Sequence, residues 1–164
     1  MTNTLRVIDI VAGTSVDGPG LRTSIYFAGC QHHCPGCHNP QSWDANAGQE
    51  MSMDDIIAVV EDNGFNVTFS GGDPLFQLEG ITELAKRLRA LGYTIWCYTG
   101  YTFEQIISRP ECQPLLKHLE VIVDGPFIES RRNISLPFRG SDNQRLIAVA
   151  PSLASNQPTL WPEN

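Results

Sequence analysis

The sequence predicts an α/β fold, namely a partial, open β/α barrel with a mostly parallel sheet and helices on its outer face. Apolar runs typical of strands alternate with segments of helical periodicity, and 164 residues are too few for a complete eight-unit barrel. The length fits one domain over residues 1–150. Residues 151–164, which contain three prolines, form a C-terminal tail that we expect to be mobile.

Each expected element has a local signal. Strands are expected where short apolar runs end in turn residues, and helices where apolar residues recur on one face behind a capping residue. The expected strands cover residues 7–11, 23–28, 67–70, 93–98 and 121–123, and a last apolar run covers residues 146–150. The expected helices lie between Ser52 and Gly64, between Leu78 and Gly92, and between Thr102 and Pro110.

Loops with unusual residues follow the expected strands. They hold the cysteines of residues 29–40, the Gly71-Gly72 turn, Tyr98-Thr99-Gly100 and Asp124-Gly125. Because the carboxyl ends of parallel strands meet at one edge of a sheet, we expect the chemistry of the protein at that edge.

The composition limits the partners and the compartment. Eleven basic and 18 acidic residues give a net charge of −7, which argues against binding nucleic acid or anionic membranes through a general positive field. There is no apolar run of eighteen residues and no secretory signal at the N-terminus, so we expect a cytoplasmic protein. The odd count of five cysteines favours a reducing compartment and a metal over a disulfide framework.

Three of these cysteines follow the pattern C-x3-C-x2-C, at Cys30, Cys34 and Cys37. Three thiolates on a short loop can hold a [4Fe-4S] cluster and leave its fourth iron uncovered. The open iron could take a chelating ligand such as the methionine part of S-adenosylmethionine. The alternative is a structural zinc site completed by His32, His33 or His38. We favour the cluster, because Cys97 and Cys112 do not form the second ligand pair usual for zinc.

A second motif is the turn Ser70-Gly71-Gly72-Asp73-Pro74 after an expected strand. Its glycines permit a ligand to approach the backbone closely, and Asp73 offers an acceptor for an ammonium group. Taken alone, the turn is more often an ordinary strand-to-helix connection in which Asp73 caps a helix, and the neighbouring cysteine motif reverses this preference.

With both motifs, the chain resembles the radical S-adenosylmethionine superfamily and, within it, the glycyl-radical-enzyme activases that activate anaerobic ribonucleoside-triphosphate reductase. The resemblance runs through most of the chain, and the cysteine spacing is its most specific part. It rests on residues 17–22, 34–40, 70–75, 98–101, 123–127, 138–141 and 143–144. The fold that it implies is the partial barrel of the radical S-adenosylmethionine type.

The resemblance implies an oxidoreductase that reductively cleaves S-adenosylmethionine and abstracts a hydrogen from a glycine of the large reductase subunit. It also implies a flavodoxin-like or ferredoxin-like electron donor. Neither nucleic acid nor membrane is expected as a partner. Two alternatives remain open for the target of the radical, which are another glycyl radical enzyme such as pyruvate formate-lyase, or a small molecule such as a nucleobase precursor.

The resemblance also assigns site residues. The iron ligands and catalytic centre would be Cys30, Cys34 and Cys37, and the residues that hold S-adenosylmethionine would be Gly36, Cys37, His38, Gly71, Gly72 and Asp73. Two positions depart from the wider superfamily. Asp73 replaces a common Glu, so its contact with the methionine ammonium could run through a water molecule. Gly36 replaces a common aromatic residue, and His38 could either stack on the adenine instead or face solvent.

Further polar residues have open roles. Asp124 could orient a ligand, bind a cation or start a turn. Five arginines stand out in this acidic protein, namely Arg22, Arg131, Arg132, Arg139 and Arg145. They could recognise the partner or the substrate carboxylate, or they could be solvated surface residues. Cys97 is expected to pack as a small apolar residue.

Overall fold

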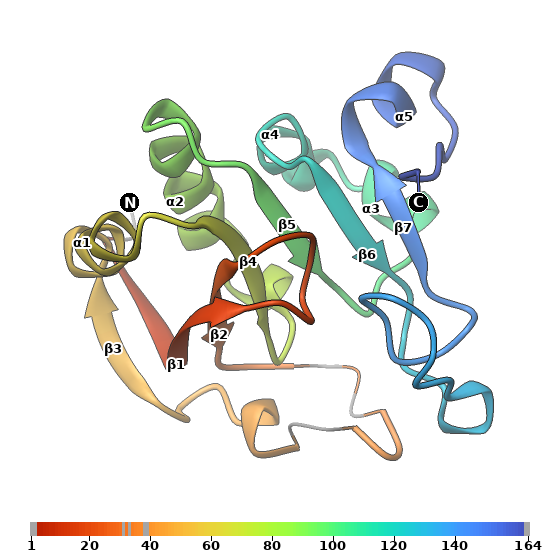
Figure 1. Ribbon diagram of the computed structural model, residues 1–164, viewed down its shortest axis with the longest axis horizontal. Coiled ribbons are helices and arrows are strands. Elements are labelled where there is room, and N and C mark those ends of the chain that lie inside the picture. Colours follow the sequence, from red (N-terminus) through yellow and green to blue (C-terminus); the bar gives the residue numbers. More distant parts are fainter. Residues whose placement is uncertain (1–2, 31, 33, 38–39, 163–164) are drawn as a thin grey trace.

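The computed structural model describes residues 3–162 except residues 31, 33, 38 and 39. Its strands form one seven-stranded sheet in the order β3-β1-β2-β4-β5-β6-β7 (Figure 1). The strands are β1 (Thr4–Thr14), β2 (Arg22–Phe27), β3 (Gln49–Ser52), β4 (Asn66–Gly71), β5 (Ile95–Tyr98), β6 (Val121–Asp124) and β7 (Arg145–Ala148). The α-helices are α1 (Met53–Asn63), α2 (Leu78–Ala90), α3 (Phe103–Ile107), α4 (Gln113–Leu116) and α5 (Val149–Ser155).

The sheet is mixed. β2, β4, β5 and β6 are parallel neighbours, whereas β1 pairs antiparallel with β2 and β3, and β7 pairs antiparallel with β6. Half of the six pairings are antiparallel, so the predicted open β/α barrel with a mostly parallel sheet is wrong. The cause lies in residues 15–21 and 125–144, both fully described, which join antiparallel neighbours without the crossover α-helix that parallel neighbours need. The polar strand β3 was also not expected.

The helices α1 to α4 pack on one face of the sheet. Their apolar side chains join those of the strands in one buried cluster, which includes Ile56, Leu84, Phe103 and Leu115. The capping signals read from the sequence are confirmed. Ser52 Oγ accepts the N–H of Asp55 at 3.1 Å, and Thr102 and Gln105 form a capping box at the start of α3.

The opposite face carries a smaller apolar cluster and a buried charge. Trp96 packs there with Val121, Val123 and Leu146, and the ring of Phe138 covers it. The guanidinium of Arg22 lies 5.6 Å from the centre of the Trp96 ring and donates to Val67 O at 2.7 Å and to Thr68 Oγ1 at 2.9 Å. Burial lowers the pKa of Arg22 to about 10. Arg22 therefore stabilises the sheet from within and is not exposed to a partner.

The C-terminal residues return to the sheet. α5 follows β7 directly, and the N–H of Ala148 donates to Thr159 O at 2.8 Å. The N–H of Trp161 donates to Leu146 O at 2.8 Å, and its ring lies 5.6 Å from that of Trp96. Residues 151–162 of the expected tail thus pack against β7 and Trp96, and the mobility of the tail stays a prediction. Within the part of the chain that is described, no helix has the length and apolar character to cross a membrane.

Candidate functional site

A cavity of about 740 Å³ opens at the carboxyl ends of the parallel strands. In Figure 1 these ends point to the lower side of the sheet, where the connection after β2 and the connection between β6 and β7 lie. Every loop that the sequence singled out at this edge contributes to the lining. The contributing residues include Cys30, Cys34, Cys37, Ser70, Gly71, Gly72, Tyr98, Thr99, Gly100, Gly125 and Phe127.

The three cysteines line one cavity, and their loop is held by backbone hydrogen bonds. The N–H of Gly29 donates to Ser42 O at 2.7 Å, and the N–H of Cys37 donates to Cys34 O at 3.1 Å, which closes a tight turn. Gly36 lies in this turn with a left-handed φ of 76°, and a Cβ there would lie 2.8 Å from Cδ of Glu129. Any side chain at position 36 would therefore have to displace the Glu129 carboxylate.

The thiols have the chemistry of metal ligands. All five cysteines are among the described residues, and none forms a disulfide. Burial raises the pKa of the Cys34 thiol, and the neighbouring Cys37 adds to this effect while a hydrogen bond with the backbone of Phe127 opposes it. A cation at this point would displace the proton and compensate the cost of burying a thiolate.

Three thiols are the donor set that a [4Fe-4S] cluster with one open iron uses, whereas a structural zinc site needs a fourth protein ligand. Within the described residues, no three His, Cys, Asp or Glu side chains converge closely enough to hold one metal ion. Zinc at about 2.3 Å from each sulfur would draw its ligands to within roughly 4 Å of one another. A cluster of four irons is larger and keeps its cysteine sulfurs farther apart. His33 and His38 lie outside the described residues.

The Gly71-Gly72 turn lines the same cavity, but its glycines also serve the fold. Gly71 has a φ of 105°, and a Cβ there would lie 2.3 Å from Phe27 N. A Cβ on Gly72 would lie 2.3 Å from Gly29 O. The close approach of β2 therefore explains both glycines, whether or not a ligand also approaches them.

Asp73 has a role that the sequence revealed only in part. Its side chain is buried, and Oδ1 accepts the N–H of Leu75 at 3.0 Å, which is the capping contact considered for it. Oδ2 accepts the Thr99 hydroxyl and the Gly100 N–H, each at 2.9 Å, and lies 2.7 Å from Nε2 of His32. The carboxylate is thus bound by protein donors on both oxygens, and its contact with an ammonium group stays a prediction.

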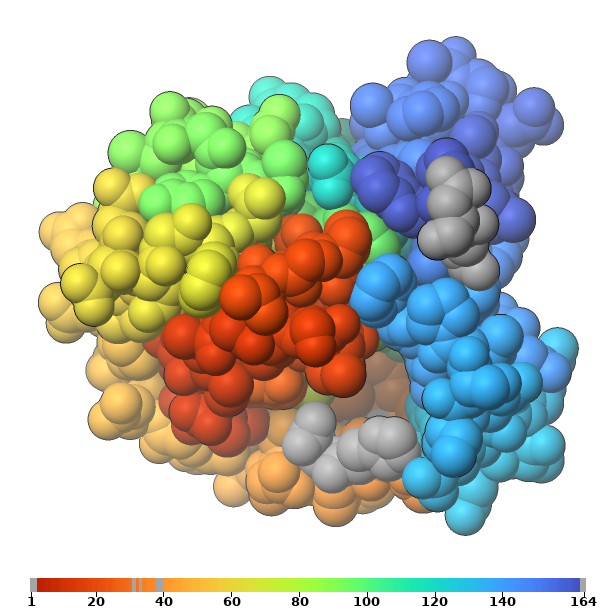
Figure 2. Space-filling model, viewed as in Figure 1, coloured from red at the N-terminus to blue at the C-terminus, as the bar shows by residue number. Residues whose placement is uncertain are grey.

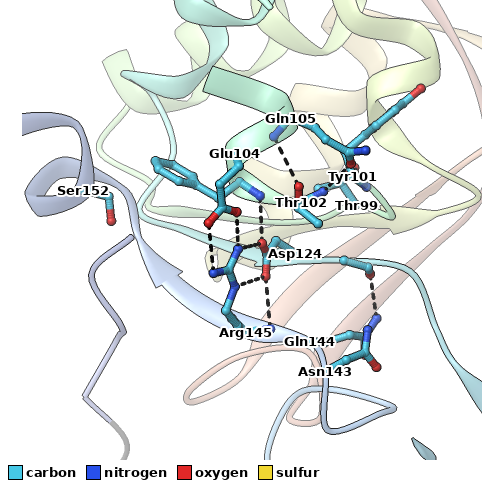
Figure 3. A network of polar contacts seen from close by, with 12 residues as sticks. Thr99, Tyr101, Thr102, Glu104, Gln105, Asp124, Asn143, Gln144, Arg145 and Ser152 are labelled. Atoms are coloured by element: carbon cyan, nitrogen blue, oxygen red, sulfur yellow. Dashed lines mark hydrogen bonds and ion pairs between the residues drawn. The ribbon is translucent and has the colours of Figure 1, made fainter. Parts of the chain in front are cut away.

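Asp124 is neutralised by Arg145 (Figure 3). It is buried at the end of β6 and accepts Nη2 of Arg145 at 2.6 Å and the N–H of Phe103 at 2.7 Å. Arg145 also donates to Glu104 at 2.6 Å. The hydrogen bonds that Arg145 donates to Asp124 and then to Glu104 raise the pKa of Arg145, and Arg145 in turn lowers the pKa of Glu104. This network fixes α3 against β6 and β7, and it leaves Asp124 no need of a further cation.

A polar wall of the cavity was predicted only in part, because the sequence analysis placed Tyr98 at this edge but gave no role to Asp17 or Tyr26. Asp17 accepts the hydroxyls of Ser24 at 2.8 Å and Tyr26 at 3.3 Å, and burial followed by the charge of Asp17 raises the pKa of Tyr26 to about 12. Tyr98 donates its hydroxyl to Phe138 O, and burial raises its pKa further still. No local pattern marks Tyr26, because a strand residue with its side chain on this face looks like ordinary alternation.

Two exposed apolar residues stand at the mouth of the cavity. Val16 precedes β2 and is 71% exposed, and Ile134 follows β6 and is 87% exposed. In Figure 2 the red N-terminal segment and the light-blue segment of the connection between β6 and β7 lie next to each other. Arg132 and Arg139 line the same cavity, whereas Arg131 is paired with Asp142 at the surface.

The class to which the chain belongs is that of single-cluster iron–sulfur domains. The chain matches a family described as a 4Fe-4S single cluster domain over residues 16–147, a range that includes the whole cavity lining except Ser15. More narrowly, the chain belongs to the family of anaerobic ribonucleoside-triphosphate reductase-activating proteins.

Three relatives with that name support this assignment. The protein of Escherichia coli (strain K12) is 36% identical over 139 residues, which are 79% of this chain and 89% of the relative. The protein of Vibrio cholerae serotype O1 is 36% identical over 140 residues, which are 79% and 88%. The protein of Enterobacteria phage T4 is 36% identical over 139 residues, which are 80% and 86%.

Proposed function

We propose that this chain is a glycyl-radical activase that reductively cleaves S-adenosylmethionine and abstracts a hydrogen atom from a glycine of anaerobic ribonucleoside-triphosphate reductase. Three thiols line one cavity at the carboxyl ends of the parallel strands, and this observation carries the proposal. The names of the relatives, which are reductase-activating proteins, supply the target.

Cys30, Cys34 and Cys37 would hold the [4Fe-4S] cluster and leave one iron for the cosubstrate. When bound, the cluster supplies one electron that splits the sulfonium of S-adenosylmethionine into methionine and a 5′-deoxyadenosyl radical. That radical takes the hydrogen atom of a glycine Cα, which gives 5′-deoxyadenosine and leaves the radical on the glycine. A flavodoxin-like or ferredoxin-like donor would supply the electron, and the oxygen-sensitive chemistry suits a reducing compartment such as the cytoplasm.

The remaining residues would bind and orient the cosubstrate. Gly71 and Gly72 line the cavity beside the thiols and would allow the methionine part to approach the backbone. Gly36, Cys37 and His38 would contact S-adenosylmethionine from the cysteine loop. Asp73 would hold the shape of the turn and accept the methionine ammonium directly or through water.

A protein substrate is supported by the open mouth of the cavity. Val16 and Ile134 line the cavity and expose apolar side chains to solvent, so a partner that enters the mouth would bury them. A small-molecule substrate generally needs enclosing walls, whereas a glycine loop of a large partner can enter from one side.

Anaerobic reconstitution tests the cluster and the cleavage. The protein should take up four irons per chain, and reduction with S-adenosylmethionine should release methionine and 5′-deoxyadenosine. Adding the anaerobic reductase should produce a glycyl-radical signal in electron paramagnetic resonance, and adding pyruvate formate-lyase should not. Cys34→Ala should abolish cluster and cleavage together, with Cys112→Ala as the matched control. A colourless protein that binds one zinc would refute the proposal.

Ile134→Ser tests the docking of the protein substrate. It should lower the rate of glycyl-radical formation several-fold while cleavage of S-adenosylmethionine without the reductase is unchanged, because the residue is exposed and outside the cysteine loop. The stability of the fold should change by less than about 0.5 kcal/mol. Leu160→Ser is the control, since Leu160 is also exposed but does not line the cavity. Equal losses in both variants would contradict a docking role for the mouth.

A further inference from the structure

His32 stands inside the cysteine loop, two residues after Cys30 and two before Cys34, and its side chain points into the protein. The side chain is only 18% exposed, and Nε2 lies 2.7 Å from Oδ2 of Asp73. Its ring packs edge-to-face on Tyr101, with 4.6 Å between the ring centres. With its proton on Nε2, His32 donates a charge-assisted hydrogen bond to a carboxylate that solvent barely reaches.

The partner of His32 is itself fixed by two strands. Asp73 follows β4 and accepts the N–H of Leu75, and it also accepts the hydroxyl of Thr99 and the N–H of Gly100 after β5. These donors hold the carboxylate in one position between the ends of β4 and β5. A group that binds Oδ2 is therefore held in a fixed position relative to the ends of β4 and β5.

The space around the imidazole is shaped to admit a ring. A Cβ on Gly100 would lie 2.5 Å from Cδ2 of His32, so the ring occupies room that only a glycine leaves. Tyr101 closes the other side, and the guanidinium of Arg109 lies 4.9 Å from the centre of the Tyr101 ring. Three contacts of different kinds thus converge on one loop side chain, which a solvated loop histidine would not show.

We propose that His32 is a positioning residue that ties the cysteine loop to Asp73 and so sets the three thiols against the Gly71-Gly72 turn. The inference rests on the proposed function, because it takes the thiols as cluster ligands. The bond joins residues 41 positions apart, and it links the loop to the edge of the sheet through protein atoms alone. It also gives the Asp73 carboxylate a role that does not depend on its touching the cosubstrate.

Thiol alkylation of the cluster-free protein tests the inference without activity as a readout. In His32→Ala, Cys34 and Cys37 should react with iodoacetamide several-fold faster than in the wild type, as read by mass spectrometry. Cys97 and Cys112 are buried internal controls whose rates should not change. His32→Gln places an amide nitrogen near the position of Nε2 and should restore slow alkylation, whereas the shorter His32→Asn should not. His118→Ala is the matched control for loss of a histidine elsewhere.

The reconstituted protein gives a second readout. A chelator should remove iron from His32→Ala at least tenfold faster than from the wild type, in the range found for supporting contacts around metal sites. The effect of His32→Ala should largely vanish in an Asp73→Ala background, because both changes remove the same bond. Wild-type protein that takes up no cluster would refute the proposed function. The role of His32 in holding the cysteine loop would still be tested by the alkylation rates, because they are measured without a cluster. Unchanged rates at Cys34 and Cys37, or equal increases at all five cysteines, would overturn the positioning role.

Discussion

The helix-covered face of the sheet and the cavity at its edge are built in different ways. On the helix-covered face, side chains such as Ile56, Leu84 and Phe103 are fully buried and belong to one apolar cluster. At the edge of the sheet beside the cavity, the ends of the strands are joined by hydrogen bonds to two buried carboxylates, those of Asp73 and Asp124. Apolar burial tolerates many similar shapes, whereas a carboxylate needs particular donors at particular distances. The first region therefore sets the stability of the fold, and the second sets the geometry of the site.

Leu84→Ala should give the largest effect on stability and tests the helix-covered face. Leu84 is fully buried on α2, so its truncation leaves a cavity and should lower the free energy of unfolding by about 3 kcal/mol. The alkylation rates of Cys34 and Cys37 in native conditions should stay unchanged. Urea denaturation of the cluster-free protein measures the free energy of unfolding, and mass spectrometry measures the alkylation rates. Leu91→Ala, at an exposed position just after α2, is the matched control and should cost little.

Such a mutation acts in a region that the sequence describes well. The periodic leucines of α2 and the caps at Ser52 and Thr102 are local signals, and the structure confirms them. The sheet topology was predicted incorrectly, because no local pattern tells whether residues 125–144 return the chain parallel or antiparallel.

The candidate site likewise has a part that the sequence predicts and a part that it does not. The spacing of Cys30, Cys34 and Cys37 is visible in the sequence, and the structure brings all three to one cavity. The bond between His32 and Asp73 spans 41 residues, and the pairing of Asp124 with Arg145 spans 21. Contacts of such separation depend on which strands are neighbours. Sequence reasoning could therefore name Asp73 and Asp124 as important without finding their partners.

Arg145→Met should give a smaller loss of stability and tests the edge of the sheet. It removes four side-chain hydrogen bonds, two to Asp124 and two to Glu104, and leaves the buried Asp124 carboxylate without its counter-charge (Figure 3). Because Arg145 is one-third exposed, we expect a loss of about 2 kcal/mol, below the cost of breaking a fully buried pair. Urea denaturation measures it.

The double variant Arg145→Met with Asp124→Asn is the control for this charge effect. It removes the isolated charge and should recover part of the lost free energy of unfolding. A double variant that is less stable than Arg145→Met alone would show that the contacts of Asp124 with Phe103 matter more than its charge.

The smallest effect is expected from pH and concerns Tyr26 on the polar wall of the cavity. The pKa of Tyr26 is raised to about 12, first by burial and then by Asp17, so the folded protein keeps a phenolic proton that the unfolded chain loses near pH 10. Between these two values the unfolded state binds fewer protons, and stability must therefore fall as the pH rises. Tyr26→Phe should reduce this fall, by about 1 kcal/mol or less because the side chain is half-buried and screened by solvent. Urea denaturation midpoints at pH 8 and near pH 11 measure this loss of stability in the wild type and in Tyr26→Phe. An equal loss in both proteins would show that another group causes the alkaline sensitivity, and Tyr98 is the next candidate.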